Sequence, residues 1–213
     1  MRRKVGTVWQ WGRLASLALW ASAVMSGCNP AAQATRQVEL PPTTVVLAGG
    51  CYWGVQSVFR HVQGVTTVTA GYAIPVPSSA GAGHDAAAEA VRLVYDSTRI
   101  SYRQILDIFF SVVHDPTEVD RQGPDVGAEY RSVVFAGNAS QRSIARAYID
   151  SLSGARRLSR PIVTEITGLG SFQVVDQSQQ DYAEKHPTDA YIVINDVPKV
   201  EALRRQFPAL YKG

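Results

Sequence analysis

The residue best suited to chemistry is Cys51, in the hexapeptide GGCYWG at residues 49–54. An apolar, β-branched run before it predicts a strand that ends near Ala48, and a helix is expected just after it. A sulfur at a helix N-terminus lies near unpaired N–H groups, which favour the thiolate. Tyr52 and Trp53 would then line an apolar cup beside a nucleophile. A free cysteine is also commonly a small buried hydrophobe, so the hexapeptide alone favours neither interpretation.

The cysteines and histidines show no metal-binding pattern. Cys28 and Cys51 are 23 residues apart, and no pair of Cys or His residues has the spacing of a structural zinc site. His114 precedes Asp-Pro and is expected to be a structural or helix-terminal residue. We therefore predict that no metal is bound, and we rank a thiol hydrolase that uses Cys51 with His84 or His114 below other functions.

Periodicity places the elements that must hold Cys51. Strands are predicted at residues 43–47, 65–72, 88–95, 131–135 and 162–167. A capping box at Ser101 and Gln104 begins a helix that should end near His114, and further helices are predicted at residues 53–60, 139–152, 176–185 and 199–207. The order embeds a split βαβ pattern. We expect an α+β fold: a two-layer ferredoxin-like sandwich with a mixed sheet and extra C-terminal helices.

The N-terminus resembles an export signal. A basic start and an apolar run at residues 14–25 precede Ser26, Gly27 and Cys28, and the run is too short to span a membrane. The ending Met-Ser-Gly-Cys resembles a lipobox, so Cys28 is predicted to carry lipid. The alternative is an ordinary cleaved signal with an incidental cysteine. We expect an exported, membrane-anchored lipoprotein that faces the periplasm.

Composition and charge complete the organisation. We predict a signal peptide at residues 1–27, a polar tether at residues 28–42 and one folded domain, a monomer, at residues 43–213. The chain has 21 basic and 18 acidic residues; the four basic residues before Cys28 leave 21 − 4 = 17 against 18, a net charge of −1. Binding to phosphates needs a concentrated basic face, so no nucleic-acid partner is expected.

Four motifs, in order, resemble those of the A-type peptide methionine sulfoxide reductases. GGCYWGVQSVF at residues 49–59 is similar to their active-site signature, with Tyr52 where the usual form has Phe. AEAVRLVYD at 88–96, HDPTEVDRQGPDVGAEYRS at 114–132 and, more weakly, FQVVDQSQQDY at 172–182 follow. The resemblance implies an oxidoreductase that reduces methionine (S)-sulfoxide, free or in proteins, to methionine.

The resemblance also implies catalytic roles. Cys51 would attack the sulfoxide and be left as a sulfenic acid, and Glu89 would protonate the departing oxygen. That role needs a buried carboxyl with a raised pKa. Tyr72 and Tyr130 would hold the oxygen by hydrogen bonds. The ordinary alternatives are a solvent-facing glutamate on an amphipathic strand and two tyrosines that pack in the core.

Three further residues are implied to bind substrate. Tyr52 and Trp53 would receive the methyl group, and Asp125 would order the pocket. Taken alone, an Asp after Pro is more often a turn former.

The chain departs from the family in ways that affect the cycle. Many relatives carry C-terminal cysteines that form a disulfide with the nucleophile, whereas no cysteine follows Cys51 here. We therefore predict no bound cofactor and a one-cysteine cycle that uses an external thiol reductant, thioredoxin-like or small, with unlipidated Cys28 as the alternative partner. The loop at residues 74–87 is shorter than usual. Ser178 and Gln179 replace the Tyr and His of many relatives, which predicts the loss of a pocket hydrogen bond.

Two functions from different classes remain. The first is repair of oxidised methionine in exported proteins. The second is a module that binds oxidised methionine without turnover.

Overall fold

The computed structural model describes residues 37–38, 40–41, 43–77, 85–155 and 158–213. The predicted signal peptide, Cys28, most of the predicted tether and His84 lie outside these residues. In the part that is described, no helix is both long and apolar enough to cross a membrane.

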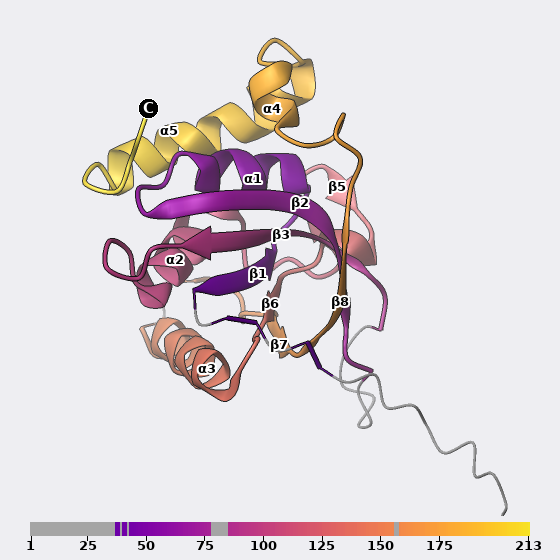
Figure 1. Cartoon of the computed structure of the whole chain (residues 1–213), viewed down its shortest axis with the longest axis vertical. Helices are drawn as coiled ribbons and strands as arrows, with labels where there is room; N and C mark the ends of the chain where they lie inside the picture. The colour runs from indigo at the N-terminus through magenta and orange to yellow at the C-terminus, as the bar shows by residue number, and fades with distance from the viewer. Residues whose placement is uncertain (1–36, 39, 42, 78–84, 156–157) are drawn as a thin grey trace, which may run out of the picture. The chain divides into compact units, whose positions relative to one another are not determined.

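A six-stranded sheet forms the centre of the fold (Figure 1). Its order is β7-β6-β1-β3-β2-β8; β6 and β7 are parallel and the other neighbours are antiparallel. Because β3 separates β1 from β2, the unit β1-α1-β2 is the predicted split βαβ, and the α+β fold with a mixed sheet is confirmed. The strands are β1 Thr44–Ala48, β2 Val65–Pro75, β3 Ala88–Tyr95, β6 Val133–Phe135, β7 Glu165–Thr167 and β8 Leu169–Val174.

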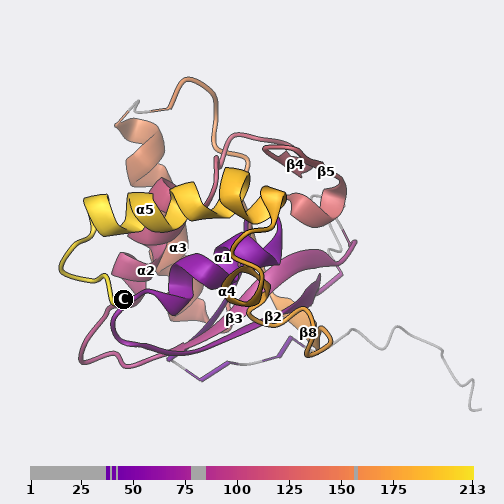
Figure 2. The ribbon, with the colours of Figure 1, turned by 90° about the horizontal axis from the view of Figure 1, so that it is seen from above.

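The helices lie on one side of this sheet (Figure 2). Helix α1 packs on β2 and β3. Helix α5, one of the predicted extra C-terminal helices, packs on the outer side of α1. The main core lies between sheet and helices and includes Leu47, Leu93, Phe59 and Ile105. The helical elements are α1 Tyr52–Arg60, α2 Tyr102–Ile108 with its π-helical continuation η1 Phe109–Val113, η2 Ala128–Tyr130, α3 Ala139–Gly154, α4 Tyr182–Lys185, η3 Ile192–Asp196 and α5 Val197–Gln206.

The capping box that the sequence predicts is present at α2. Ser101 accepts a hydrogen bond from the backbone N–H of Gln104, and the Gln104 side chain accepts one from the backbone N–H of Ser101. Two orphan N–H groups are satisfied in this way, which fixes where the helix begins.

The opposite face of the sheet has a smaller core that includes Val46, Ala90 and Phe135. Part of its cover comes from residues just before β1, where we expected a tether. The Val38 N–H donates to the Leu169 carbonyl at 2.6 Å, and Leu40 packs against this core. The packed part of the chain therefore begins a few residues before Thr43.

Two predicted boundaries are wrong, and one strand was not predicted. The helix expected at residues 176–185 is only α4, because Gln180 instead inserts into β2: its side chain donates to the Ala70 carbonyl and accepts from the Ala70 N–H, at 2.8 and 3.0 Å. Strand β7 begins at Glu165 rather than at residue 162, because the Val163 N–H pairs with the Pro116 carbonyl. Strand β8 was not expected, and it forms on the extended end of β2.

Candidate active site

Cys51 lies where β1 gives way to α1, as its N-cap residue, and is 9% exposed. Gly50 has φ +94°, a conformation that favours glycine. A Cβ on Gly49 would lie 2.9 Å from the Phe109 ring and 3.1 Å from His114. Gly49 therefore lets the chain pass close to Phe109 of η1 and to His114, and Gly50 lets it turn into α1 at Cys51.

Glu89 reaches the same place from β3. Strand alternation puts it on the helix-facing side with Val91 and Leu93, and the β2–β3 register sets it directly opposite Tyr72. Its Oε2 accepts a hydrogen bond from the Tyr52 N–H, in the first turn of α1, at 3.1 Å. The Tyr72 hydroxyl donates to Oε1 at 3.5 Å. Cys51 and Glu89 are thus joined through one residue of backbone.

The environment of Glu89 favours its protonated form. The carboxyl is 7% exposed, and burial raises its pKa to about 7, against the hydrogen bonds from the Tyr52 N–H and the Tyr72 hydroxyl. The nearby carboxylates of Asp125 and Glu129 raise this pKa further. The predicted direction of the shift is confirmed, and the alternative of a solvent-facing glutamate is wrong.

The environment of Cys51 acts differently from the prediction. The backbone N–H of Trp53 hydrogen-bonds to the sulfur and lowers its pKa, as expected at a helix N-terminus. Burial, followed by the charge of Glu89, outweighs this effect and raises the pKa of the thiol to about 12. We expected the site to favour the thiolate, and this is wrong: the effects that raise the pKa of the thiol outweigh the one that lowers it, so the sulfur is held as a thiol.

Three phenols surround these two residues. Burial and the Glu89 charge raise the pKa of Tyr72, and raise that of Tyr130 to about 12, so both hydroxyls remain proton donors. The Tyr191 hydroxyl donates to the Asp125 carboxylate at 2.5 Å, and burial, followed by the Cys51 charge, raises its pKa. Asp125 therefore holds Tyr191 in the pocket as well as ending a turn.

Aromatic rings cluster around Trp53 at the start of α1. Tyr52 meets Trp53 edge to face at 6.2 Å between centroids. Tyr182 stacks on Trp53 at 3.9 Å and 12°, and Tyr191 meets the same indole edge to face at 5.9 Å. The Gln179 Oε1 accepts from the Trp53 indole N–H at 3.2 Å. The pocket hydrogen bond that we expected to be lost at this position is made by Gln179.

Three residues near Cys51 were not predicted from the sequence, and all come from the C-terminal segment: Tyr182, Tyr191 and Asp196. Asp196 is 1% exposed and ion-paired with Lys199 at 3.2 Å. A single tyrosine or aspartate in a polar segment carries no periodic signal, so these residues were unremarkable before the fold brought them to α1.

His114 has no role as a base. Its Nδ1 pairs with the Phe109 carbonyl at 3.0 Å and its Nε2 with the Ser132 hydroxyl at 2.7 Å. Burial lowers its pKa to about 4, so the ring is neutral at physiological pH. Both nitrogens are engaged in the fold, which leaves the hydrolase hypothesis without a Cys-His pair at this histidine.

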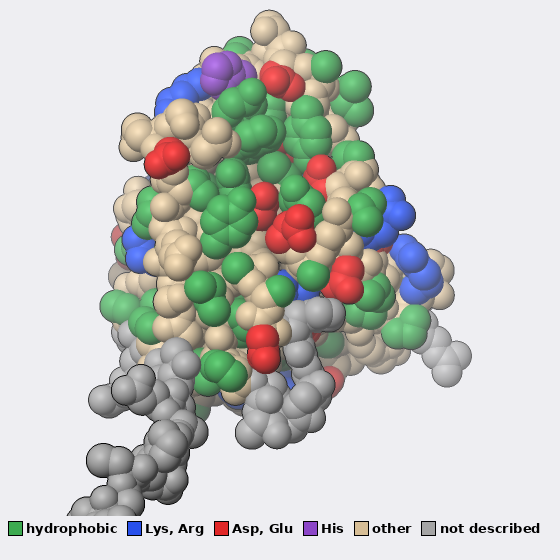
Figure 3. All heavy atoms as spheres, turned by 90° about the vertical axis from the view of Figure 1, so that its right-hand side faces the viewer, with side chains coloured by type: hydrophobic (Ala, Val, Ile, Leu, Met, Phe, Trp, Pro, Cys, Tyr) green, Lys and Arg blue, Asp and Glu red, His purple; other side chains and the backbone are tan. Residues whose placement is uncertain are grey.

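The surface around the site is apolar with acidic groups set into it. The face on the side of β5 (Asp125–Val126) and β8 carries hydrophobic side chains around several carboxylates (Figure 3). Within the described ranges no group of three or more His, Cys, Asp or Glu side chains could hold a metal ion.

Comparisons with known proteins agree with this site. A family model described as Peptide methionine sulfoxide reductase matches residues 43–210. Peptide methionine sulfoxide reductase MsrA 2 of Mesorhizobium japonicum is 44% identical over 173 residues, which cover 79% of this chain and 89% of that protein. The protein of the same name from Synechocystis sp. is 38% identical over 185 residues, or 84% of each chain.

Solved structures share the fold. Mxr1 from Saccharomyces cerevisiae in reduced form has a TM-score of 0.59 at 26% identity, over 71% of this chain and 91% of that one. Methionine sulfoxide reductase A of Corynebacterium diphtheriae has a TM-score of 0.54 at 28% identity, over 70% and 77%.

The fold and the pocket together define a small α+β oxidoreductase built around one buried cysteine. The matched length and the identities go further: the chain belongs to the peptide methionine sulfoxide reductase family, and within it to the A type. It is a methionine sulfoxide reductase. The resemblance that four motifs carried in the sequence is thereby confirmed.

Proposed function

We propose that the chain reduces the S epimer of methionine sulfoxide, free or in proteins, by a thiol-dependent cycle that passes through a Cys51 sulfenic acid. One observation carries this proposal: a buried carboxyl, Glu89, whose pKa is raised to about 7, is hydrogen-bonded to the first turn of the helix that begins at Cys51. An acid with a pKa near the working pH is well matched to proton transfer.

The first half of the cycle transfers oxygen. The substrate methyl group lies against Trp53 and Tyr52, and the oxygen lies toward Glu89, Tyr72 and Tyr130. Cys51 attacks the sulfoxide sulfur while Glu89 gives its proton to the oxygen and recovers one from the thiol. The hydroxyl then passes from the substrate sulfur to the Cys51 sulfur: the substrate sulfur–oxygen bond and the new sulfur–sulfur bond both break, a sulfur–oxygen bond to Cys51 forms, and an electron pair stays on the substrate sulfur. The substrate sulfur gains two electrons as the Cys51 sulfur loses two, giving methionine and a sulfenic acid.

The second half of the cycle restores the thiol. The chain has two cysteines, and Cys51 is the one that lies in the described domain. An external thiol, thioredoxin-like or small, attacks the sulfenic sulfur and releases water. A second thiol then reduces the mixed disulfide and frees Cys51.

A single-turnover experiment tests this cycle. Enzyme without reductant is mixed with an excess of each sulfoxide epimer, and we expect one methionine per chain from the S epimer and none from the R epimer. Dimedone, which traps sulfenic acids, should then label the Cys51 peptide in mass spectrometry. With dithiothreitol, turnover should become continuous.

Each contrary result has a distinct meaning. Binding of sulfoxide without methionine would favour a module that only recognises oxidised methionine. A Cys28–Cys51 disulfide in place of the dimedone adduct would contradict the one-cysteine cycle.

We propose further that the enzyme is exported and anchored through lipid on Cys28, where it repairs oxidised exported proteins. The support is the order of basic, apolar and small residues before Cys28. Cys28→Ala should shift the protein from the membrane fraction to the soluble fraction and remove the added lipid mass from its N-terminal peptide. Cys51→Ser is the matched control and should stay in the membrane. An unchanged distribution of Cys28→Ala would contradict the anchor.

A further inference from the structure

Asp196 is a buried carboxylate to which the proposed reaction gives no role. It ends η3, is 1% exposed, and its Oδ1 lies 3.2 Å from the Lys199 Nζ. Among the described residues, no hydrogen-bond partner meets its Oδ2. A buried charge is costly, so a carboxylate in this position calls for an explanation beyond packing.

The carboxylate lies against the first turn of α1. A Cβ on Gly54 would overlap the Asp196 Oδ1 and would lie 2.8 Å from the Lys199 Nζ. Gly54 is the third helical residue after Cys51, so glycine at this place is what lets the ion pair reach the turn. Glu89 meets the same turn from the sheet, whereas Asp196 meets it from η3 and α5.

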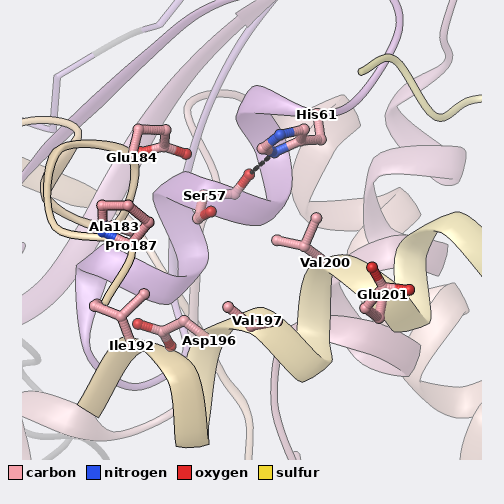
Figure 4. Close-up of a pocket in the computed structure, with 10 residues that line it drawn as sticks. All are labelled: Ser57, His61, Ala183, Glu184, Pro187, Ile192, Asp196, Val197, Val200 and Glu201. Carbon is pink, nitrogen blue, oxygen red and sulfur yellow. Dashed lines mark hydrogen bonds between the residues drawn. The ribbon is translucent and has the colours of Figure 1, made fainter. Parts of the chain in front are cut away.

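A cavity of about 190 Å³ adjoins Asp196 on this side of α1 (Figure 4). Ser57 from α1 and His61, which caps the C-terminus of that helix, line it together with Glu184 and Glu201. Its walls are mostly apolar with these polar groups among them, and it has room for water, so Oδ2 can be hydrated while Oδ1 is paired with Lys199. Burial raises the pKa of Asp196, and the Lys199 ammonium opposes this rise by favouring the charged form.

We propose that Asp196 is a positioning residue for the reaction, which fixes the first turn of α1 and sets the charge around the Cys51 sulfur from the side opposite Glu89. The proposal rests on Cys51 being the nucleophile. Asp196 is paired with Lys199 and takes no part in the proton transfers of the proposed cycle. It keeps the resting sulfur as a thiol, which alkylating agents and peroxides attack more slowly than a thiolate.

The charges around the sulfur agree with this assignment. Asp196 raises the pKa of the Cys51 thiol, after burial and Glu89 and ahead of Asp125, while the Trp53 N–H lowers it. Three carboxylates act on the sulfur: Glu89 on β3, Asp125 on β5 and Asp196 at the end of η3. Four phenols lie around it: Tyr52, Tyr72, Tyr130 and Tyr191. The basic groups on these elements are His114, beside Gly49, and Lys199, beside Gly54.

The test measures alkylation of Cys51 in the full chain. The Cys51 peptide is followed by mass spectrometry with iodoacetamide and, separately, with the bulkier N-ethylmaleimide. Asp196→Asn keeps the shape and removes the charge, so both rates should rise by about threefold at neutral pH, because a larger fraction of the sulfur is then thiolate. The matched control is Asp181→Asn, which removes a carboxylate paired with Arg60 at the other end of α1 and should change neither rate.

The two reagents separate charge from access. A much larger rise with N-ethylmaleimide than with iodoacetamide would mean that access to the sulfur has loosened, and it would overturn the proposal, as would rates equal to those of Asp181→Asn. If Asp196→Asn does not fold, Asp196→Ser removes the same charge with a smaller side chain and should give the same rise. Alkylation needs no sulfoxide, so the result stands even if the proposed reduction of sulfoxide fails.

Discussion

Cys51→Ser is expected to lower methionine formation by about a thousandfold or more, the scale seen when a nucleophile is removed. Serine is nearly isosteric with cysteine, and the site is 9% exposed, so the fold should be retained. The serine hydroxyl can accept the Trp53 N–H hydrogen bond, but it is a far weaker nucleophile and has no sulfenic state. The loss should therefore appear in kcat, while the substrate pocket remains formed.

The measurement is turnover of the S epimer with dithiothreitol, alongside the thermal unfolding midpoint of each variant. Cys28→Ser is the matched control, because it removes the other cysteine of the chain and should leave turnover unchanged. If Cys51→Ser kept more than about a hundredth of the wild-type rate, the oxygen would have to be accepted elsewhere, and the assignment of Cys51 as nucleophile would be wrong.

The sequence predicted those parts of the site that depend on local order along the chain. Cys51 follows a strand and begins a helix, so periodicity alone places it at the N-terminus of α1. Strand alternation separates Glu89 from Ala88 and Ala90, although it leaves open which face is buried. The pairing of Glu89 with Tyr72 depends on the β2–β3 register, which the loop between these strands does not reveal.

Two parts of the site could not be predicted: the net shift in the pKa of Cys51, and the residues that the C-terminal segment contributes. A helix N-terminus lowers the pKa of a thiol, but the sign of the net shift at Cys51 depends on how deeply the fold buries it and on how near Glu89 lies. Tyr182, Tyr191 and Asp196 reach the pocket because the segment around them packs across α1. Such packing is tertiary, and their spacing in sequence does not encode it.

Glu89→Gln is expected to lower turnover by about a hundredfold or more, the usual contribution of a positioned general acid. Glutamine keeps the size of the side chain and can still accept from the Tyr52 N–H, but it has no proton to transfer. In the wild type, kcat/KM should fall as pH rises through about 7, because Glu89 then loses the proton that it must give. The variant should lack this limb of the profile.

A matched control separates the acid from its neighbours. Glu129 raises the pKa of Glu89, so Glu129→Gln should move the limb to lower pH and leave the plateau rate within a few-fold of wild type. A limb that persists in Glu89→Gln would identify another group as the acid.

Two further readouts should move opposite to activity. The Glu89 charge raises the pKa of Cys51, so Glu89→Gln should speed alkylation of the sulfur even as turnover falls. The folded-state pKa of Glu89 is also raised, from 4.5 to about 7, so the stability that it contributes is present below pH 4.5 and is lost as pH rises to about 7. The variant does not share this loss, and above neutral pH its advantage in unfolding free energy should reach about 3 kcal/mol. Lower activity, faster alkylation and an advantage in stability over the wild type that grows with pH would together show that the variant has lost an acid. Loss of a structural contact would instead lower stability relative to the wild type at every pH.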